Sequence, residues 1–286
     1  MHLTEKQLQR QTRARRDWTP PGPIPPGPNG DPDLLPSADE SLDAFAGHWR
    51  IFQLRQGHRY STDDLLAAWY AVSTCRKLGI TPQRALDLGC GIGSVGLFVA
   101  WSFPELRLTG VEAQSVSAAL ARRSIRYNGI ADRVFVHDGD LRSGVPAGPF
   151  DLITGSPPYW DPRDGTLSDA PQKAPCRFEQ RGGVEDYCQA AATALAPEGV
   201  FALVMDGRQR DRVLAGAHAA GLAILSIRDV VPREGKPPLM VLAAMTHAAT
   251  ATEAPREEPP LMLRDRAGVR TDEFREIRRQ MGMPPG

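Results

Sequence analysis

The sequence lacks the features that would stabilise a small secreted domain or hold a metal ion. Its four cysteines include no pair at C-x-x-C spacing and its histidines show no metal-ligand spacing, so we expect no metal site. It also lacks a recognisable signal peptide and any apolar run of about 18 residues, so no membrane-spanning helix is expected. These absences favour a protein of the reducing cytoplasm. The cysteines are Cys75, Cys90, Cys176 and Cys188.

A surplus of charge of either sign is also missing. Lys and Arg number 34, as do Asp and Glu, so the formal net charge is zero. Bulk electrostatic attraction to nucleic acid is therefore not expected, and any basic surface must be local. The apolar fraction of 41% and the charged fraction of 24% are ordinary for a globular protein. A hydrophobic core can thus form without disulfides or metals.

The first 40 residues lack the pattern of a folded domain. Residues 20–36 contain eight prolines and three glycines, which disfavour a helix or a paired strand, so we expect a linker or a disordered arm over 1–40. The first 16 residues carry five Lys and Arg against Glu5, a charge of plus four. Such an arm is either a solvated chain end or a contact to nucleic-acid phosphates. A mitochondrial-type transit peptide is a third alternative.

From about residue 41 to 248, apolar periodicity predicts one domain of alternating strands and helices, followed by a linker and tail over 249–286 that packs on or near it. The alternation indicates a parallel sheet, and two last strands joined by a short Pro-rich turn must be antiparallel. We therefore expect an α/β, Rossmann-like fold with a mostly parallel seven-stranded sheet and a C-terminal antiparallel pair. Helices are predicted at 62–75, 94–103, 116–127, 184–196 and 208–220, and strands at 85–88, 106–111, 133–137, 150–154, 199–205, 222–231 and 239–245.

The turn after the first of these strands, Gly89-Cys-Gly-Ile-Gly93, is rich in glycine. Open α/β sheets bind ligands outside the carboxyl ends of their strands, so this turn should hold a cofactor. The overlapping Gly91-Ile-Gly-Ser-Val-Gly96 fits the dinucleotide fingerprint, which leaves a nicotinamide-dependent oxidoreductase open. Asp87, directly before the turn, favours S-adenosylmethionine instead. A carboxylate there would repel a diphosphate and attract an ammonium and a sulfonium.

Two more acidic residues follow predicted strands. We expect Glu112 to accept hydrogen bonds from the ribose hydroxyls, and Asp140, next to Leu141, to accept from the adenine amino group. The alternative is that both are ordinary polar strand ends.

A second turn, Gly155-Ser-Pro-Pro-Tyr-Trp160, follows the strand at 150–154 and indicates the chemistry. The Ser156 oxygen and the Pro157 carbonyl could hold the two hydrogens of an exocyclic amine and direct its lone pair at a methyl donor. Tyr159 would stack on the base, a contact worth about 1 to 3 kcal/mol. Catalysis would then rest mainly on positioning. The alternative is that the prolines merely end a strand.

Together these motifs resemble the class I methyltransferases that carry an (N/D/S)-P-P-(Y/F/W) motif and modify planar nitrogens, and Glu112 and Asp140 resemble that class's ribose and adenine contacts. The likeness is greatest to the bacterial tRNA(valine) adenine-N6 methyltransferases and extends over most of residues 40–280. The resemblance implies S-adenosylmethionine as cofactor and tRNA as partner, with an adenosine at position 37, beside the anticodon, as substrate. Further segments resembling that family are Arg59–Asp63, Arg177–Glu179, Glu234–Pro237 and Leu261–Phe274.

This chain departs from that family at Ser156, where the family has Asn, although a hydroxyl is still an acceptor. Ser-Pro-Pro-Tyr also resembles the motif of DNA cytosine-N4 methyltransferases. The acceptor is therefore adenine N6 or another planar amine: cytosine N4, an rRNA base or a release-factor glutamine. A further alternative is an RNA-binding or interaction module that has lost catalysis. The basic N-terminus is a second departure and could serve another RNA or a protein partner. The oligomeric state stays open, and a monomer is assumed.

The candidate residues fall into three sets. The catalytic set is Ser156, Pro157, Pro158 and Tyr159. The cofactor-binding set is Asp63, Asp87, Gly89, Cys90, Gly91, Gly93, Glu112, Asp140 and Leu141. The substrate set is Trp160, Arg177, Glu179 and Lys236, of which Arg177 and Glu179 alternatively form a structural ion pair and Lys236 contacts a phosphate. Cys90 and Cys188 are expected to be small packing residues, not nucleophiles.

Overall fold

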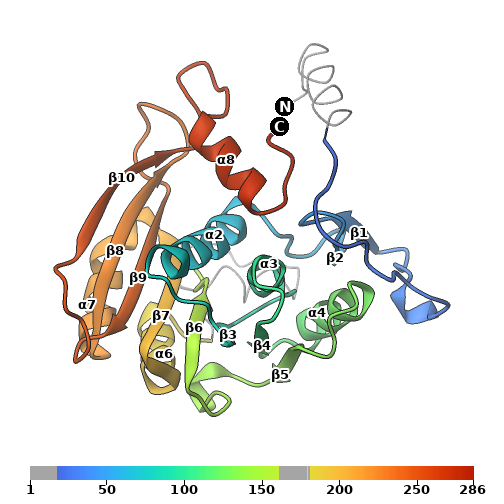
Figure 1. Cartoon of the computed structure of the whole chain (residues 1–286), viewed down its shortest axis with the longest axis horizontal. Helices are drawn as coiled ribbons and strands as arrows, with labels where there is room; N and C mark the ends of the chain where they lie inside the picture. The colour runs from blue at the N-terminus through green and yellow to red at the C-terminus, as the bar shows by residue number, and fades with distance from the viewer. Residues whose placement is uncertain (1–17, 161–178, 180) are drawn as a thin grey trace.

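The centre of the molecule is an eight-stranded mixed sheet (Figure 1). The computed structural model describes residues 18–160, 179 and 181–286. The strands are β3 (Arg84–Leu88), β4 (Arg107–Glu112), β5 (Val134–Asp138), β6 (Phe150–Gly155), β7 (Leu195–Asp206), β8 (Leu222–Val231), β9 (Met240–His247) and β10 (Arg256–Met262). Their order in the sheet is β10-β8-β9-β7-β6-β3-β4-β5.

Strands β3 to β7 form a parallel unit whose order reverses at β3. The chain runs outward from β3 through β4 to β5, then returns to place β6 and β7 on the other side of β3. Such a reversal opens a crevice at the carboxyl ends of the strands. Leu88 pairs with Gly155, so the turns that follow β3 and β6 leave the sheet side by side.

The C-terminal part of the sheet contains one strand more than the seven expected. β9 runs antiparallel to β7 and β8, as the short turn between β8 and β9 requires, and the additional strand β10 pairs parallel to β8 at the edge. β10 contains Pro259 and Pro260, and a pair of prolines in a sequence argues against predicting a strand there. An edge strand tolerates proline because one side of it needs no hydrogen-bond partner, and the pairing register shifts between Glu258 and Leu261 to accommodate the two rings.

Helices cover both faces of the sheet (Figure 1). One face packs against α2, α3, α4 and α8, and the other against α6 and α7. Among the described residues, no helix combines the length and apolar character needed to cross a bilayer. Between residues 62 and 247 every predicted helix and strand is present, with ends shifted by a few residues. The helices are α2 (Thr62–Lys77), α3 (Ser94–Ser102), α4 (Ser115–Tyr127), α6 (Val184–Ala194), α7 (Arg210–Ala219) and α8 (Asp272–Gln280), with short 3-10 turns η1 (Pro32–Leu34), η2 (Leu141–Ser143) and η3 (Gly207–Gln209).

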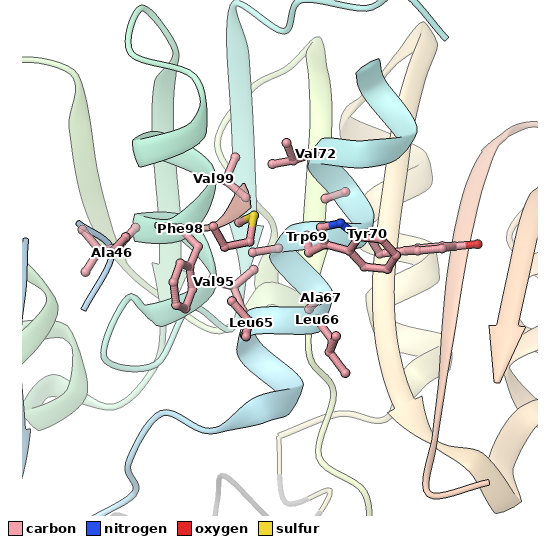
Figure 2. Packing of buried hydrophobic residues seen from close by; sticks show 14 of the residues in the cluster. Ala46, Leu65, Leu66, Ala67, Trp69, Tyr70, Val72, Val95, Phe98 and Val99 are labelled. Carbon is pink, nitrogen blue, oxygen red and sulfur yellow. The ribbon is translucent and has the colours of Figure 1, made fainter. Parts of the chain in front are cut away.

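Helix α2 is fixed at its start and buried along most of its length. The Ser61 amide donates to Asp64 Oδ2 at 2.7 Å, half of a capping box that satisfies the first turn. Figure 2 shows the α2 side chains Leu65 and Trp69 in the same cluster as Phe98 of α3. A helix that is apolar on nearly all sides belongs in the core. Its N-terminal carboxylates are therefore held in a rigid position.

The Pro-rich segment 20–36 differs from the linker or disordered arm that its composition predicts. It lies along α4, where the Arg123 guanidinium donates to the carbonyls of Asp33 (2.7 Å) and Leu35 (3.0 Å). Prolines disfavour helices and central strands, but their segment can still be ordered when side chains satisfy its carbonyls. Residues 1–17 lie outside the described part of the chain.

A two-stranded antiparallel hairpin that the sequence did not indicate follows this segment. It consists of β1 (Glu40–Ala44) and β2 (Arg50–Leu54). It is held to α4, because the Phe52 amide donates to Ser124 Oγ at 3.0 Å and the buried Asn128 exchanges hydrogen bonds with the backbone of Arg50. The hairpin thus covers α4 and leads the chain into α2.

Candidate functional site

A cavity of about 500 Å³ lies at the carboxyl edge of the sheet, where the strand order reverses. It is bounded by the segment before α2, the glycine turn, the ends of β4 and β5, and the turn after β6. The predicted residues that line it are Asp63, Asp87, Gly89, Cys90, Gly91, Glu112, Asp140, Leu141, Ser156, Pro157, Pro158, Tyr159 and Trp160. Gly93, Glu179 and Lys236 are not among the lining residues, and Arg177 lies outside the described residues.

The glycine turn has backbone conformations that other residues adopt at a cost. Gly89 and Gly91 have φ of 59° and 57°. A Cβ on Gly89 would collide with the Tyr187 hydroxyl, whereas a Cβ on Gly91 would meet no protein atom within 4 Å. Gly91 therefore presents bare backbone to the cavity. Gly93 lies outside the lining: it precedes α3, and a Cβ on it would lie 3.3 Å from Ala121 of α4.

Cys90 fills the space beneath this turn. Its side chain is 7% exposed, and a Cβ on Gly110 would lie 2.6 Å from its sulfur. Burial raises the pKa of the thiol well above its usual value, and the nearby Asp87 acts in the same direction. Cys90 is therefore a neutral packing residue under ordinary conditions. Burial likewise raises the pKa of Cys188, to about 12.

Asp87 contributes charge to the cavity and links its walls. Its two oxygens accept hydrogen bonds from the Thr154 hydroxyl (2.7 Å) and the Gly96 amide (2.9 Å), so it ties β3 to β6 and to α3. Burial raises its pKa to about 7. Because Asp87 is only 1% exposed, it acts on a ligand through its field more than by direct contact.

Glu112 stands at the end of β4 and holds the glycine turn. Its carboxylate accepts from the Gly91 amide (2.8 Å) and from the Gln114 amide (2.6 Å). Burial raises its pKa, and the two amides partly oppose that shift. Each carboxylate oxygen has a second lone pair, so the side chain can still accept from a vicinal diol.

Asp140 and Leu141 lie beyond β5. Asp140 caps η2 and takes a two-pronged contact from the Arg142 guanidinium, at 2.9 and 2.6 Å, which lowers its pKa. Its carboxylate is thus ionised, and its acceptor sites are shared with Arg142. Leu141 is buried beside it and supplies an apolar wall.

The turn after β6 presents Ser156 and Tyr159 to the cavity, with Pro157 and Pro158 buried between them. The Tyr159 hydroxyl donates to Asp63 Oδ2 at 3.2 Å. Burial, followed by the charge of Asp63, raises the pKa of Tyr159 well above 10. The phenol is therefore neutral, and its hydroxyl joins the turn after β6 to the start of α2.

Asp64 is a cavity residue that sequence reasoning missed. Its Oδ1 accepts from the Ser94 hydroxyl at 2.8 Å, which connects α2 to the start of α3. Burial, with the neighbouring Asp63, raises its pKa to about 7. The Ser61-x-x-Asp64 capping box was visible in the sequence, but nothing there showed that the carboxyl faces a cavity.

Two residues outside the cavity lining contact Trp160 and Tyr159, and the sequence did not single them out. The Arg208 guanidinium lies over the exposed Trp160 ring, 4.6 Å from its centroid, and Gln209 Nε2 donates to the Tyr159 carbonyl at 2.8 Å. Both come from η3, directly after β7. No motif marks them, because they reach Trp160 and Tyr159 only through the order of the strands.

Two predicted substrate residues lie elsewhere. Glu179 forms a bidentate ion pair with Arg212 of α7, at 2.5 and 2.9 Å. This contact favours the alternative that Glu179 belongs to a structural ion pair, although its partner is Arg212 and not the expected Arg177. Lys236 is exposed in the loop between β8 and β9.

The cavity suits a ligand with a cationic end and disfavours a diphosphate. Five acidic side chains and two arginines line it. The bare backbone of Gly91 leaves room for a ligand between the buried carboxyls of Asp64 and Asp87 on one side and the acceptors of Glu112 and Asp140 on the other. An excess of carboxyls raises the energy of an anion and lowers that of an ammonium or sulfonium. These residues fit S-adenosylmethionine.

Comparison with known proteins agrees with this geometry. The model of the methyltransferase small domain family matches residues 72–215. A tRNA1(Val) (adenine(37)-N6)-methyltransferase of Porphyromonas gingivalis is 28% identical over 225 residues, covering 76% of this chain and 85% of that protein. The same enzyme of Yersinia pseudotuberculosis is 27% identical over 216 residues, covering 74% and 81%. A crystal structure of a predicted O-methyltransferase from Agrobacterium tumefaciens shares the fold with a TM-score of 0.59 at 20% identity, covering 78% of this chain and 98% of that one.

Proposed function

This chain belongs to the methyltransferase small domain family and is an S-adenosylmethionine-dependent N-methyltransferase, and from that premise we propose that its acceptor is the N6 amine of an adenosine in tRNA. One observation carries the proposal: the Ser-Pro-Pro-Tyr turn lines the same cavity as the glycine turn. A group that holds an amine thereby lies next to the place of the methyl donor.

The cofactor residues have separate tasks in this proposal. Glu112 binds the ribose hydroxyls, Asp140 and Leu141 bind the adenine, and the bare backbone of Gly91 lets the ligand lie close to the turn. Asp64 and Asp87 provide negative potential for the cationic end. S-adenosylmethionine, when bound, supplies an electrophilic methyl group on its sulfonium.

The substrate amine is held by Ser156 and the Pro157 carbonyl. Tyr159 donates its single hydroxyl hydrogen to Asp63, so its oxygen can only accept from the neighbouring Ser156 hydroxyl. The lone pairs of Ser156 are then available to accept from the amine. A hydroxyl oriented in this way can replace the amide oxygen of Asn at the same position of the motif. With two acceptors on its hydrogens, the amine directs its lone pair at the methyl group.

The named relatives support tRNA as the partner, and position 37 is the site in their names. The Tyr159 ring at the cavity and the Trp160 ring at its mouth are suited to stack on unpaired bases, such as those of an anticodon loop. A protein with this function is expected in the cytoplasm, together with tRNA.

Transfer of a tritiated methyl group from S-adenosylmethionine to total tRNA tests the proposal. We expect label in N6-methyladenosine with the wild type and at least a hundredfold less with Tyr159→Ala, which loses the stacking ring and the bond that orients Ser156. Label in N4-methylcytidine, in rRNA or in a release factor would assign a different planar amine. An unlabelled tRNA pool together with label in none of these would reject the proposal.

A further inference from the structure

Two loops lie beyond the cavity at the same carboxyl edge of the sheet. β8 and β10 run parallel to β7. The ends of β7 and β8 lie level, because Asp206 of β7 and Val230 of β8 both pair with Met240 of β9. The end of β10 lies level with them, because its Met262 pairs with Val231 of β8. The loops after β8 (232–239) and after β10 (263–271) therefore emerge at the same edge as Ser156.

These loops, with α8, concentrate positive charge that carboxylates do not neutralise. The loops contain five Lys and Arg against two acidic residues, in a chain whose formal charge is zero. Within the described residues, five basic side chains of the loops and α8 make no ion pair, whereas neighbouring Arg266 pairs with Glu234 and Arg275 with Asp272. The five, which we call the basic edge, are Arg233, Lys236, Arg264, Arg270 and Arg278.

Three of these arginines are held close together by neutral groups. Arg264 and Arg270 face each other across an isolated β-bridge. Arg270 Nη1 donates to a carbonyl of the C-terminal segment at 3.3 Å, and Arg278 Nε donates to another at 2.8 Å. Burial, together with nearby Arg270, lowers the pKa of Arg278 to about 10.

Arg270 in addition has a buried Nε that makes no hydrogen bond. A buried donor without a partner destabilises a protein, and clustered cations repel one another. A bound anion would relieve the repulsion between these cations.

We propose that the basic edge binds the phosphate backbone of the RNA whose adenosine enters the cavity. This rests on the proposed function. Strands are spaced about 4.8 Å apart, so the end of β10, four strands from β6, lies roughly 20 Å from the Ser-Pro-Pro-Tyr turn. A surface at that distance contacts phosphates several nucleotides from the reacting base, and phosphate contacts fix the register of the RNA. The chain has no bulk positive charge, so its RNA affinity depends on such a local surface.

Two double variants test the basic edge separately, Arg233→Gln/Lys236→Gln and Arg264→Gln/Arg270→Gln. The first variant changes only exposed loop residues, so the proposal can still be tested if the second variant misfolds. The matched control is Arg76→Gln/Arg107→Gln, which removes two exposed cations at the opposite edge of the sheet. Binding of tRNA is measured from low to high salt, alongside kcat, the KM for tRNA and the Kd for S-adenosylmethionine.

We expect each basic-edge variant to bind tRNA about tenfold more weakly at low salt and to lose roughly 1.4 from the slope of log K against log salt, since each single-stranded phosphate contact contributes about 0.7. The KM for tRNA should rise, with kcat and cofactor affinity unchanged. If the variants bind tRNA with the same affinity and the same salt dependence as the control, the basic edge does not bind RNA and this proposal is rejected. The proposed function would stay intact if the wild type still methylates tRNA.

If the wild type methylates no tRNA, the binding measurement still tests the basic edge. Loss of RNA affinity in the variants would then show that this surface binds RNA, although the proposed function is rejected. Variant-sensitive binding to phosphatidylserine vesicles with no measurable RNA binding would assign the surface to a membrane and reject the proposal.

Discussion

The carboxyl groups around the cavity differ in what surrounds them. Asp64 and Asp87 are buried, and burial raises the pKa of each to about 7, whereas Arg142 lowers the pKa of Asp140. The buried pair is thus only partly ionised at neutral pH in the absence of a cation. A cationic ligand favours the ionised forms, so these two groups respond to the methyl donor and Asp140 does not.

Replacing Asp87 by Asn should change how stability depends on pH. In the folded protein the pKa of Asp87 is about 7, against 3.8 in its unperturbed state. Between these values the folded chain binds a proton that the unfolded chain has lost, so this group lowers the free energy of unfolding as pH rises from about 4 to about 7. Asn has no such titration. Urea unfolding of the cofactor-free proteins should therefore show Asp87→Asn gaining stability relative to wild type between pH 5 and pH 8.

The matched control for that measurement is Asp132→Asn, which changes an exposed carboxyl. Its stability relative to wild type should be nearly the same at both pH values. A difference between wild type and Asp87→Asn that does not vary with pH would contradict the burial argument.

Tyr159→Phe separates the hydroxyl of this residue from its ring. The variant retains the stacking surface but loses the hydrogen bond to Asp63 and the acceptor that the proposal offers to the Ser156 hydroxyl. A net hydrogen bond contributes about 0.5 to 1.5 kcal/mol, so kcat should fall roughly 3- to 10-fold while the KM for tRNA stays unchanged. Steady-state methylation of tRNA measures both. Tyr127→Phe, on α4, is the control and should behave as wild type; a rise in KM with kcat unchanged in Tyr159→Phe would contradict the positioning role.

At the scale of elements, the C-terminal tail is part of the fold. β10 completes the sheet edge, and α8 packs its apolar side on the core formed with α2. Trp69 Nε1 donates to Gln280 at 3.1 Å, and Arg228 pairs with Glu273 at 2.8 Å, so α8 is joined to both α2 and β8. The tail thereby supports the loops of the basic edge.

Phe274→Ala should measure what α8 contributes. Phe274 is 5% exposed, and truncating a buried Phe destabilises a protein by about 3 to 5 kcal/mol. Glu276→Ala, on the exposed side of the same helix, should alter stability by no more than about 0.5 kcal/mol. Denaturant unfolding of both variants checks this. Equal midpoints for Phe274→Ala and wild type would mean that α8 does not pack as described.

The sequence predicted the elements that form from local patterns and missed those that depend on contacts between distant segments. The alternating strands and helices from α2 to β9 follow from apolar periodicity and turn residues within each segment. The hairpin of β1 and β2 and the order of the Pro-rich segment depend on contacts with α4, which is distant in sequence. β10 contains two prolines, and only its place at the sheet edge makes a strand possible there.

At the scale of the whole molecule, the same distinction applies to the site. The glycine turn, Glu112, Asp140 and the Ser-Pro-Pro-Tyr turn follow strands directly, so the topology of a parallel sheet was sufficient to bring them together. Asp64 reaches the cavity through helix packing, and Arg208 reaches Trp160 through strand order, which no local pattern records. The cofactor role predicted for Gly93 stays a prediction, because this residue lies outside the cavity lining and beside α4.

Mass spectrometry of nucleosides from the tRNA of a strain that lacks this gene tests whether the enzyme methylates adenine N6 in tRNA. We expect N6-methyladenosine to disappear from a tRNA, to return with the wild-type gene and not to return with Tyr159→Ala. N6-methyladenosine at the wild-type level in tRNA of the deletion strain would contradict it.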